Sequence, residues 1–128
     1  MASAPTIVAS ADCGNSPKNL LLKKWNIAFA KGQVKVLLKS VTDDIVWNIL
    51  GDKKVEGKAA FAAVLNEMKQ TKVKRFVIHN IVTHGKAGAV NGEMTVASGQ
   101  TFSFCDVYQF ASAKGQAIQS ITSYVMTS

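Results

Sequence analysis

The clearest alternation of apolar and polar side chains lies in the stretch Thr101–Phe110. Successive side chains of a strand point to opposite faces, so every second residue shares a face. Of the five residues that share one face here, four are aromatic and one is an aspartate: Phe102, Phe104, Asp106, Tyr108 and Phe110. An ionised carboxylate among aromatic rings is costly unless it is hydrogen-bonded, and otherwise its pKa rises. The pattern therefore predicts an apolar pocket that contains Asp106.

Helical spacing of apolar residues dominates the first half of the chain. Ser16 is a good helix cap and Pro17 suits a first helical turn, so a helix is expected to begin there. Gly32 ends its apolar stripe. Beyond it the pattern predicts a second short helix over residues 33–40, a turn at 42–44, a short strand over 45–50 and a third helix after Gly57.

Strand patterns dominate the second half, where stretches rich in Val and Ile alternate with short connections that contain glycine. Such connections join neighbouring antiparallel strands, so a meander is expected over residues 74–84, 88–97, 101–110 and 117–126. Helices that precede a meander indicate an α+β fold in which the helices cover one face of a curved sheet. Because helices cannot fill a strongly curved face completely, a cone-shaped pocket lined by alternate strand residues should remain.

The length of 128 residues and the composition are typical of one soluble globular domain. Apolar residues make up 48% of the chain, and no apolar run approaches the roughly 18 residues of a membrane span. Residues 1–15 lack the basic start and the apolar block of a secretory signal. We therefore expect a flexible N-terminal tail over residues 1–15, a single domain over residues 16–128, and a cytoplasmic protein.

The formal net charge of +7 raises the question of a nucleic-acid partner. The lysines are scattered along the chain, and Arg75 is the single arginine. Arginine makes most bidentate contacts to phosphates and bases. This distribution favours solvated surface lysines, so nucleic acid is not expected as a partner. Binding that weakens with salt would support it.

Neither a cofactor nor a metal is expected from the sequence. The chain contains no Gly-x-Gly-x-x-Gly fingerprint and no Walker-type loop, the glycine-rich patterns that hold nucleotide phosphates. Two histidines and scattered acids do not form a metal-ligand set, and neither do Cys13 and Cys105. Cys105 lies on the opposite strand face from Asp106 and is expected to be a packed free thiol.

Several short motifs follow one another along residues 17–126. They are Ala-Lys-Gly-Gln at 30–33, Thr-Asp-Asp at 42–44, Gly57 before a helix, the aromatic strand at 104–110 and Ile-Thr-Ser-Tyr at 121–124. Together they resemble the nuclear transport factor 2-like superfamily, especially its SnoaL-like and ketosteroid isomerase-like branch. The resemblance implies a cone-shaped α+β barrel, in which a curved, mostly antiparallel sheet wraps around about three N-terminal helices. It also implies a mostly apolar pocket and a dimer formed through the sheet.

In ketosteroid isomerases an Asp on this strand stays protonated and helps to hold an enolate oxygen, and Asp106 matches its position. The tyrosine that completes that site aligns with Trp25, which can donate one N–H but cannot exchange a proton. The general-base aspartate falls near Ile49 or Asn48, and neither residue can take a proton from carbon. The resemblance therefore implies a related fold without the steroid isomerase reaction.

Two other branches of the superfamily suggest chemistry for the pocket. In SnoaL-type polyketide cyclases an acidic residue serves as acid and base in an aldol closure, a role that Asp106 could fill alone. Epoxide hydrolases use an Asp–Arg–Asp set, which ranks lower because Arg75 begins a strand without two carboxylates nearby in the sequence. One hypothesis is thus isomerase- or cyclase-type acid–base chemistry without a cofactor, centred on Asp106, on a small apolar or carbonyl-containing molecule. The alternative is a noncatalytic ligand- or protein-binding module.

Five side chains are candidates for the pocket wall around Asp106: Trp25, Trp47, Tyr108, Tyr124 and His79. Tyr108 and Tyr124 are expected on the interior face, whereas the two faces of the strand around His79 are equally apolar and do not decide its side. The outward face of the last two strands is expected to be semi-apolar, and a second copy in a homodimer is its simplest cover. Its expected residues are Ser103, Cys105, Val107, Gln109, Ile121, Ser123 and Val125.

Overall fold

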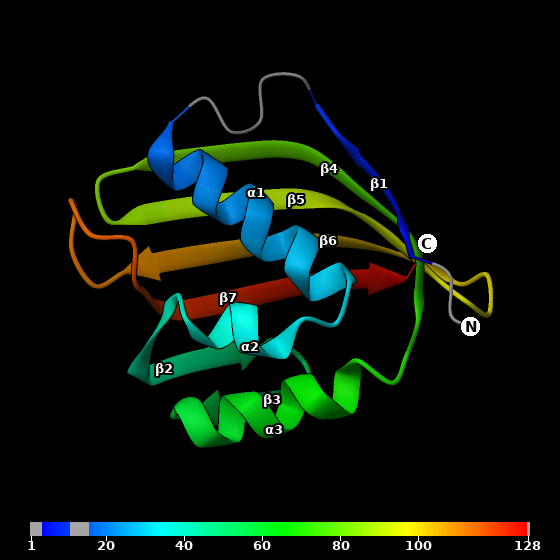
Figure 1. The fold of residues 1–128 in the computed structure, drawn as a ribbon, viewed down its shortest axis with the longest axis horizontal. Coiled ribbons are helices and arrows are strands. Elements are labelled where there is room, and N and C mark those ends of the chain that lie inside the picture. Colours follow the sequence, from blue (N-terminus) through cyan, green and yellow to red (C-terminus); the bar gives the residue numbers. More distant parts are fainter. Residues whose placement is uncertain (1–3, 11–15, 128) are drawn as a thin grey trace.

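The structure is a computed structural model that describes residues 4–10 and 16–127. In these residues a curved sheet of seven strands carries three helices on its concave side (Figure 1). The architecture confirms the predicted α+β fold. The helices are α1 (Pro17–Ala30), α2 (Val34–Leu38) and α3 (Lys58–Met68); the strands are β1 (Thr6–Ala9), β2 (Val41–Ile49), β3 (Lys53–Glu56), β4 (Val73–His84), β5 (Ala87–Val96), β6 (Thr101–Phe110) and β7 (Ile118–Thr127).

The strands lie in the order β1-β4-β5-β6-β7-β2-β3. Strands β4 to β7 form the predicted antiparallel meander, and β3 pairs antiparallel with β2. The β1–β4 and β2–β7 pairs are parallel. Since β1 and β3 stand at the two edges, the described sheet does not close, and it wraps around the helices as a cone (Figure 1).

Helix α1 begins where the sequence predicts it. The Ser16 side chain accepts a hydrogen bond from the backbone N–H of Asn19 at 3.2 Å, and Pro17 occupies the first turn, where a missing N–H is harmless. The helix ends at Ala30, and Gly32 follows with a φ of 70°, a left-handed conformation that favours glycine. These signals fix where α1 crosses the concave face of the sheet.

Three segments of the sheet differ from the expectation. Residues 42–44, expected as a turn, belong to β2, where the pairing with β7 is irregular between Val41 and Val46. The polar side chains fit because this part of the strand is largely exposed. Strand β3 gives little hydrophobic signal, because Val55 is its single buried residue. Strand β1 falls within the expected tail and extends the sheet beside β4; Cys13 lies outside the described residues.

A bend between β4 and β5 deepens the concave face. The pairing shifts register between Ile78 and Asn80, which leaves His79 as the extra residue of a β-bulge. Beside it, Gly92 approaches β4 so closely that a Cβ atom would lie 1.8 Å from the carbonyl oxygen of Val77. Because bulges and glycine kinks curve sheets, this contact supplies part of the curvature that separates the sheet from the helices.

The core beneath the helices is aromatic. Phe61 of α3 is fully buried, and its ring centroid lies 6.4 Å from that of Trp25 and 5.4 Å from that of Trp47. Trp25 also meets Tyr108 edge to face at 5.9 Å. These contacts join α1, α3, β2 and β6 at one end of the concave face.

Gly92→Ala is expected to destabilise the fold by about 3 kcal/mol or more, because the clash is with backbone that must move. Gly88→Ala is the matched control, since the atom nearest to its added Cβ is the flexible end of Leu22, at 2.9 Å. It should cost less than about 1.5 kcal/mol. Denaturant unfolding measures both changes, and equal costs would contradict the close approach at Gly92.

Candidate functional site

A cavity of about 540 Å³ lies between the helices and the concave face of the sheet. Its wall is mostly apolar, with contributions from all three helices and from β2, β4, β5, β6 and β7; Phe29, Leu37, Leu65, Phe76, Met94 and Phe104 are among its residues. A mostly apolar concave site with a few polar groups is the usual form of a small-molecule pocket. The cavity is therefore the candidate site.

Asp106 is the one acidic residue among the described residues that line the cavity. It projects from β6 on the face that it shares with Phe104 and with Tyr108, as the alternation predicts. Register places it opposite Val90 of β5 and Ser123 of β7. The cavity leaves the carboxyl group partly accessible, whereas the surrounding protein withdraws it from bulk water.

Two hydroxyl groups, those of Ser123 and Tyr108, hydrogen-bond to the Asp106 carboxyl. Each hydroxyl also has a donor behind it. Trp47 Nε1 donates to Ser123 Oγ at 2.8 Å, and Asn26 Nδ2 donates to Tyr108 Oη at 3.0 Å. An indole N–H and an amide NH₂ group can only donate, so both hydroxyl protons remain free to point at Asp106. This chain of donors favours the ionised carboxylate as the acceptor at its centre.

Burial raises the pKa of Asp106 from 3.8 to about 6, although the hydrogen bonds from Ser123 and Tyr108 partly lower it. Burial also raises the pKa of Tyr108 well above its ordinary value, and the negative charge of Asp106 adds to this. Tyr108 therefore stays protonated and keeps donating. At neutral pH Asp106 is mostly ionised, with a proton affinity matched to acid–base work near that pH.

Trp47 and Tyr108 belong to the hydrogen-bond chain around Asp106, and Trp25 packs against Tyr108. Both indole rings line the cavity, but the N–H of Trp25 donates to the carbonyl of Leu37 at 3.1 Å and so is already engaged. Tyr108 is fully buried behind the wall and acts on the cavity through Asp106. Trp25 thus contributes an apolar surface to the site.

The expected interior position of Tyr124 is wrong. Register pairs Cys105 with Tyr124 and Asp106 with Ser123, so alternation sends Tyr124 to the outer face, where it is half exposed. The same parity turns Ser123 inward, and Ile121 and Val125 with it, although all three were expected outside. A shift of one residue in the assumed register of β7 exchanges the two faces.

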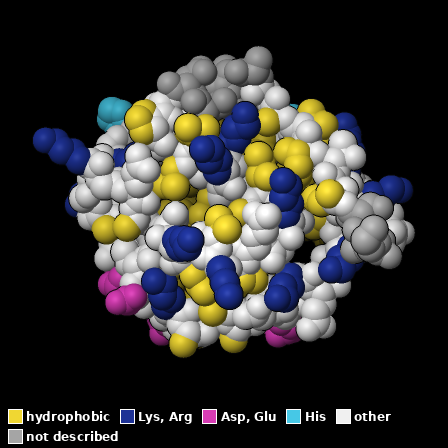
Figure 2. Space-filling model, viewed as in Figure 1, with side chains coloured by type: hydrophobic (Ala, Val, Ile, Leu, Met, Phe, Trp, Pro, Cys, Tyr) yellow, Lys and Arg dark blue, Asp and Glu magenta, His cyan; other side chains and the backbone are white. Residues whose placement is uncertain are grey.

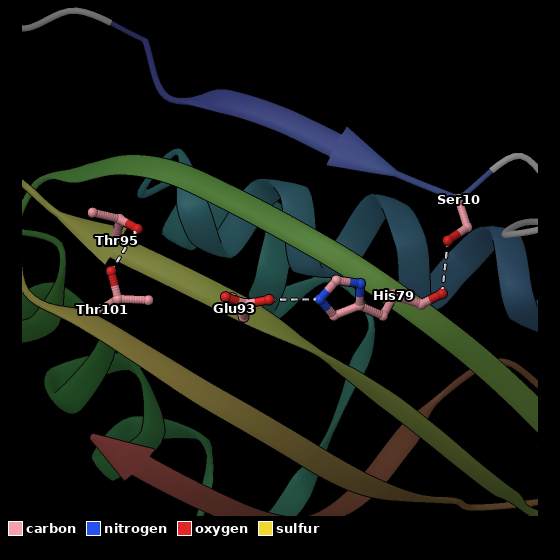
Figure 3. Close-up of polar contacts among 5 residues, drawn as sticks. All are labelled: Ser10, His79, Glu93, Thr95 and Thr101. Carbon is pink, nitrogen blue, oxygen red and sulfur yellow. Dashed lines mark hydrogen bonds and ion pairs between the residues drawn. The ribbon is translucent and has the colours of Figure 1, made fainter. Parts of the chain in front are cut away.

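His79 also lies away from the cavity. It stands in the bulge of β4 on the side of the sheet opposite the helices, where its Nε2 contacts Glu93 Oε2 at 2.8 Å (Figure 3). Both side chains are about half exposed, at 47% each. Such a surface pair contributes little stability. His79 is not among the described residues that line the cavity, so it has no role in the chemistry of the cavity.

Sequence reasoning missed two members of the donor chain, Asn26 and Ser123. Asn26 had a signal, because it is an amide on the apolar side of a predicted helix, and it is 2% exposed in the structure. A buried amide must find partners, and Asn26 donates to the Leu22 carbonyl as well as to Tyr108. Ser123 had no such signal in the sequence, because only the register between β6 and β7 brings it to Asp106.

The described residues contain no group of three or more His, Cys, Asp and Glu side chains that could hold a metal ion. Cys105 is a free thiol, and burial together with the neighbouring Asp106 raises its pKa. Arg75 is exposed and does not line the cavity, so an Asp–Arg–Asp set is not assembled there. No helix among the described residues combines the length and apolar character needed to span a membrane.

The cone-shaped α+β fold, with its apolar cavity behind the meander, defines the nuclear transport factor 2-like class. Within that class, the model of the SnoaL-like domain matches residues 22–119, so the chain belongs to the SnoaL-like family. This confirms the resemblance read from the sequence motifs. No curated protein matches the sequence.

Solved structures agree on the fold. An NTF2-like protein of unknown function from Cytophaga hutchinsonii is 26% identical, with a TM-score of 0.64 over 84% of this chain and 97% of its own. A putative SnoaL-like polyketide cyclase from Shewanella denitrificans is 15% identical, with a TM-score of 0.72 over 87% of this chain and 92% of its own. An LEH-like epoxide hydrolase from M. tuberculosis is 18% identical, with a TM-score of 0.71 over 84% and 80%. The latter two show the fold alone.

The raised pKa of Asp106 predicts a specific dependence of stability on pH. Between pH 3.8 and about 6 the folded protein keeps a proton that the unfolded chain has released. The free energy of unfolding should therefore fall as pH rises through this window, by roughly 2–3 kcal/mol from this group. Asp106→Asn should remove that part of the fall, and denaturant unfolding at several pH values measures it. Asp52→Asn, at an exposed turn, is the control; identical profiles for the wild type and Asp106→Asn would contradict the assignment.

Proposed function

We propose that the protein binds a small apolar, carbonyl-containing molecule in the cavity and that Asp106 exchanges a proton with it as acid and base. The observation that carries this proposal is the placement of one carboxylate, with both neighbouring hydroxyls donating to it, at the wall of an apolar cavity. A base in this position has the pKa that favours proton transfer near neutrality. The cyclase named among the structural neighbours supports the same class of chemistry.

The proton transfer balances without a cofactor. A C–H bond beside the carbonyl breaks, its proton goes to a carboxylate oxygen of Asp106, and the electron pair moves to the carbonyl oxygen as an enolate. The enolate then takes that proton back from Asp106 at another carbon, or its carbon attacks a second carbonyl in the same molecule, whose oxygen takes the proton from Asp106. The first outcome is an isomerisation and the second is a cyclisation.

The enolate formed from the substrate must delocalise much of its own negative charge, because the described residues offer its oxygen no free indole donor. The indole N–H of Trp25 is engaged by Leu37 and that of Trp47 by Ser123, so neither is free to stabilise an enolate oxygen. Preorganised donors of that kind are usually the largest source of catalysis of such reactions. A 1,3-dicarbonyl compound, whose second carbonyl shares the charge, fits this site better than a simple ketone.

Hydrogen–deuterium exchange at the central carbon of an apolar 1,3-diketone, such as benzoylacetone, tests the proposal by proton NMR in D₂O. The rate of exchange should rise with pH through about 6 as Asp106 ionises. Asp106→Asn should lower the catalysed rate by about a hundredfold or more. Asp52→Asn should leave it unchanged.

Binding of the diketone without faster exchange would contradict the catalytic part of the proposal. It would favour the noncatalytic ligand-binding module instead. If neither binding nor exchange occurs for any apolar carbonyl compound, the assignment of the cavity as a ligand site is wrong. A cytoplasmic location is part of the proposal and rests on the sequence expectation.

The outer face of the sheet supports a second proposal, a homodimer formed through β4 to β7. Apolar side chains stand exposed on this face, with Met126 at 71%, Val82 at 62% and Tyr124 at 50%. Asn80, Asn91 and Ser103 lie beside them, and the charged group on the same face of β5, Glu93, is paired with His79. A face of this kind can pack against a second copy across a two-fold axis without burying unpaired charge.

Replacing both Tyr124 and Met126 by Lys should convert the dimer to a monomer, because like charges would meet near the two-fold axis. Leu20 and Val36 are also exposed apolar residues, but they lie on helices α1 and α2. Their replacement by Lys is the matched control and should leave the dimer intact. Sedimentation equilibrium distinguishes these states, and a monomeric wild type would contradict the proposal.

A further inference from the structure

Three lysines line the cavity together with its apolar residues: Lys31, Lys69 and Lys72. Lys31 follows the last residue of α1, Lys69 follows the last residue of α3, and Lys72 precedes β4. The ends of the two helices meet, because a Cβ atom on Gly32 would lie 3.2 Å from the Cβ of Lys69. Three segments far apart in the sequence thus place lysines around one part of the cavity wall.

Lys72, in this part of the wall, lies far from Asp106 along the sheet. The carbonyl of Lys72 accepts a hydrogen bond from the N–H of Ala97 at 2.9 Å, which places Lys72 at the end of the sheet where β5 turns into β6. Asp106 lies opposite Val90 of β5, and Val90 is seven residues before Ala97 in the sequence. At about 3.3 Å per strand residue, roughly 20 Å of sheet separates the two positions.

The wall between these two ends is apolar. Met94 and Val96 of β5, and Phe102 and Phe104 of β6, all line the cavity along this path. The cavity therefore has an acid near one end, an apolar middle, and lysines near the other end. That order of chemical groups is a constraint on the shape and charge of any ligand that fills it.

The lysine end carries positive charge with no carboxylate of the described residues paired to it. All three lysines are exposed, and none of them forms an ion pair with a described residue. Figure 2 shows basic side chains spread over the face that carries the helices, with acidic ones at its margin. Low-dielectric walls beside such charges strengthen their attraction for an anion.

From this arrangement we infer that the ligand is an elongated apolar monoanion, with its anionic head at Lys31, Lys69 and Lys72 and its apolar body reaching toward Asp106. The inference rests on the proposed function of the cavity as a ligand site and adds a charge and an orientation. The reverse orientation would place two negative charges together in the apolar interior, which is strongly unfavourable.

A purely structural role accounts for part of the arrangement. Lysines at helix C-termini interact favourably with the helix dipole, and Lys31 and Lys69 both cap helices. Lys72 is not at a helix end, yet it lines the same cavity. Helix capping and anion binding can be told apart by ligand affinity. Lysines that only cap helices would affect the binding of a charged and an uncharged ligand equally.

Two fluorescent probes with the same ring system test the inference: anilinonaphthalene sulfonate, which is an anion, and N-phenylnaphthylamine, which is neutral. The combined variant Lys31→Gln, Lys69→Gln and Lys72→Gln should weaken binding of the sulfonate by about tenfold. Binding of the neutral probe should change less than about twofold. The control variant Lys24→Gln, Lys35→Gln and Lys53→Gln removes the same net charge at exposed positions that do not line the cavity, and it should change neither affinity by more than about twofold.

Val125→Trp reports whether the probes occupy the cavity, because Val125 lines it from a position that is 51% exposed and can accept a larger side chain. It should weaken both probes. Equal effects of the two lysine variants on the sulfonate, or equal loss of both probes in the first variant, would overturn the inference while leaving the cavity as a ligand site. Failure of Val125→Trp to weaken either probe would instead count against the proposed function.

Discussion

The close approach of β4 and β5 at Gly92 is the constraint on which the cavity depends. A side chain at residue 92 would clash with the Val77 carbonyl, so only glycine permits this approach. The bulge at His79 lies beside it, and a bulge with a neighbouring glycine bends a sheet. The bend separates the meander from the helices, whose aromatic cluster around Phe61 fills one region of the concave face. The space that remains is the cavity, and its size follows from backbone geometry as much as from side chains.

The cavity gives Asp106 its chemistry. Surrounding protein makes the charge costly and raises its pKa, while Ser123 and Tyr108 supply hydrogen bonds that keep the ionised form accessible. Trp47 and Asn26 fix the direction of those hydrogen bonds because they can only donate. An ionised acceptor is thus built into the wall, in contrast to the neutral donor that the resemblance to ketosteroid isomerases implies. The site is arranged to receive a proton at neutral pH.

Alternation along a single strand was enough to predict that Asp106 lies in an apolar pocket, and helix capping was enough to place the start of α1. Contacts between strands were not predictable in the same way. Tyr124 and Ser123 exchange faces with a one-residue change in register, and no local signal in β7 determines that register. The bulge at His79 and the lysines around the cavity depend on segments brought together by the fold. Local pattern therefore identified the acid and Tyr108 beside it, whereas Ser123 and Asn26 became evident only from the tertiary structure.

The pKa of Asp106, measured by carboxyl-selective NMR and assigned with Asp106→Asn, tests the central claim most directly. A value near 6, well above the value of about 3.9 for a free aspartate, is the expected result. It would establish a desolvated carboxylate that is mostly ionised at neutral pH and able to act as a base. A value at or below about 4 would contradict the account, because it would mean a solvated or charge-paired carboxylate without the proton affinity that the proposed chemistry requires.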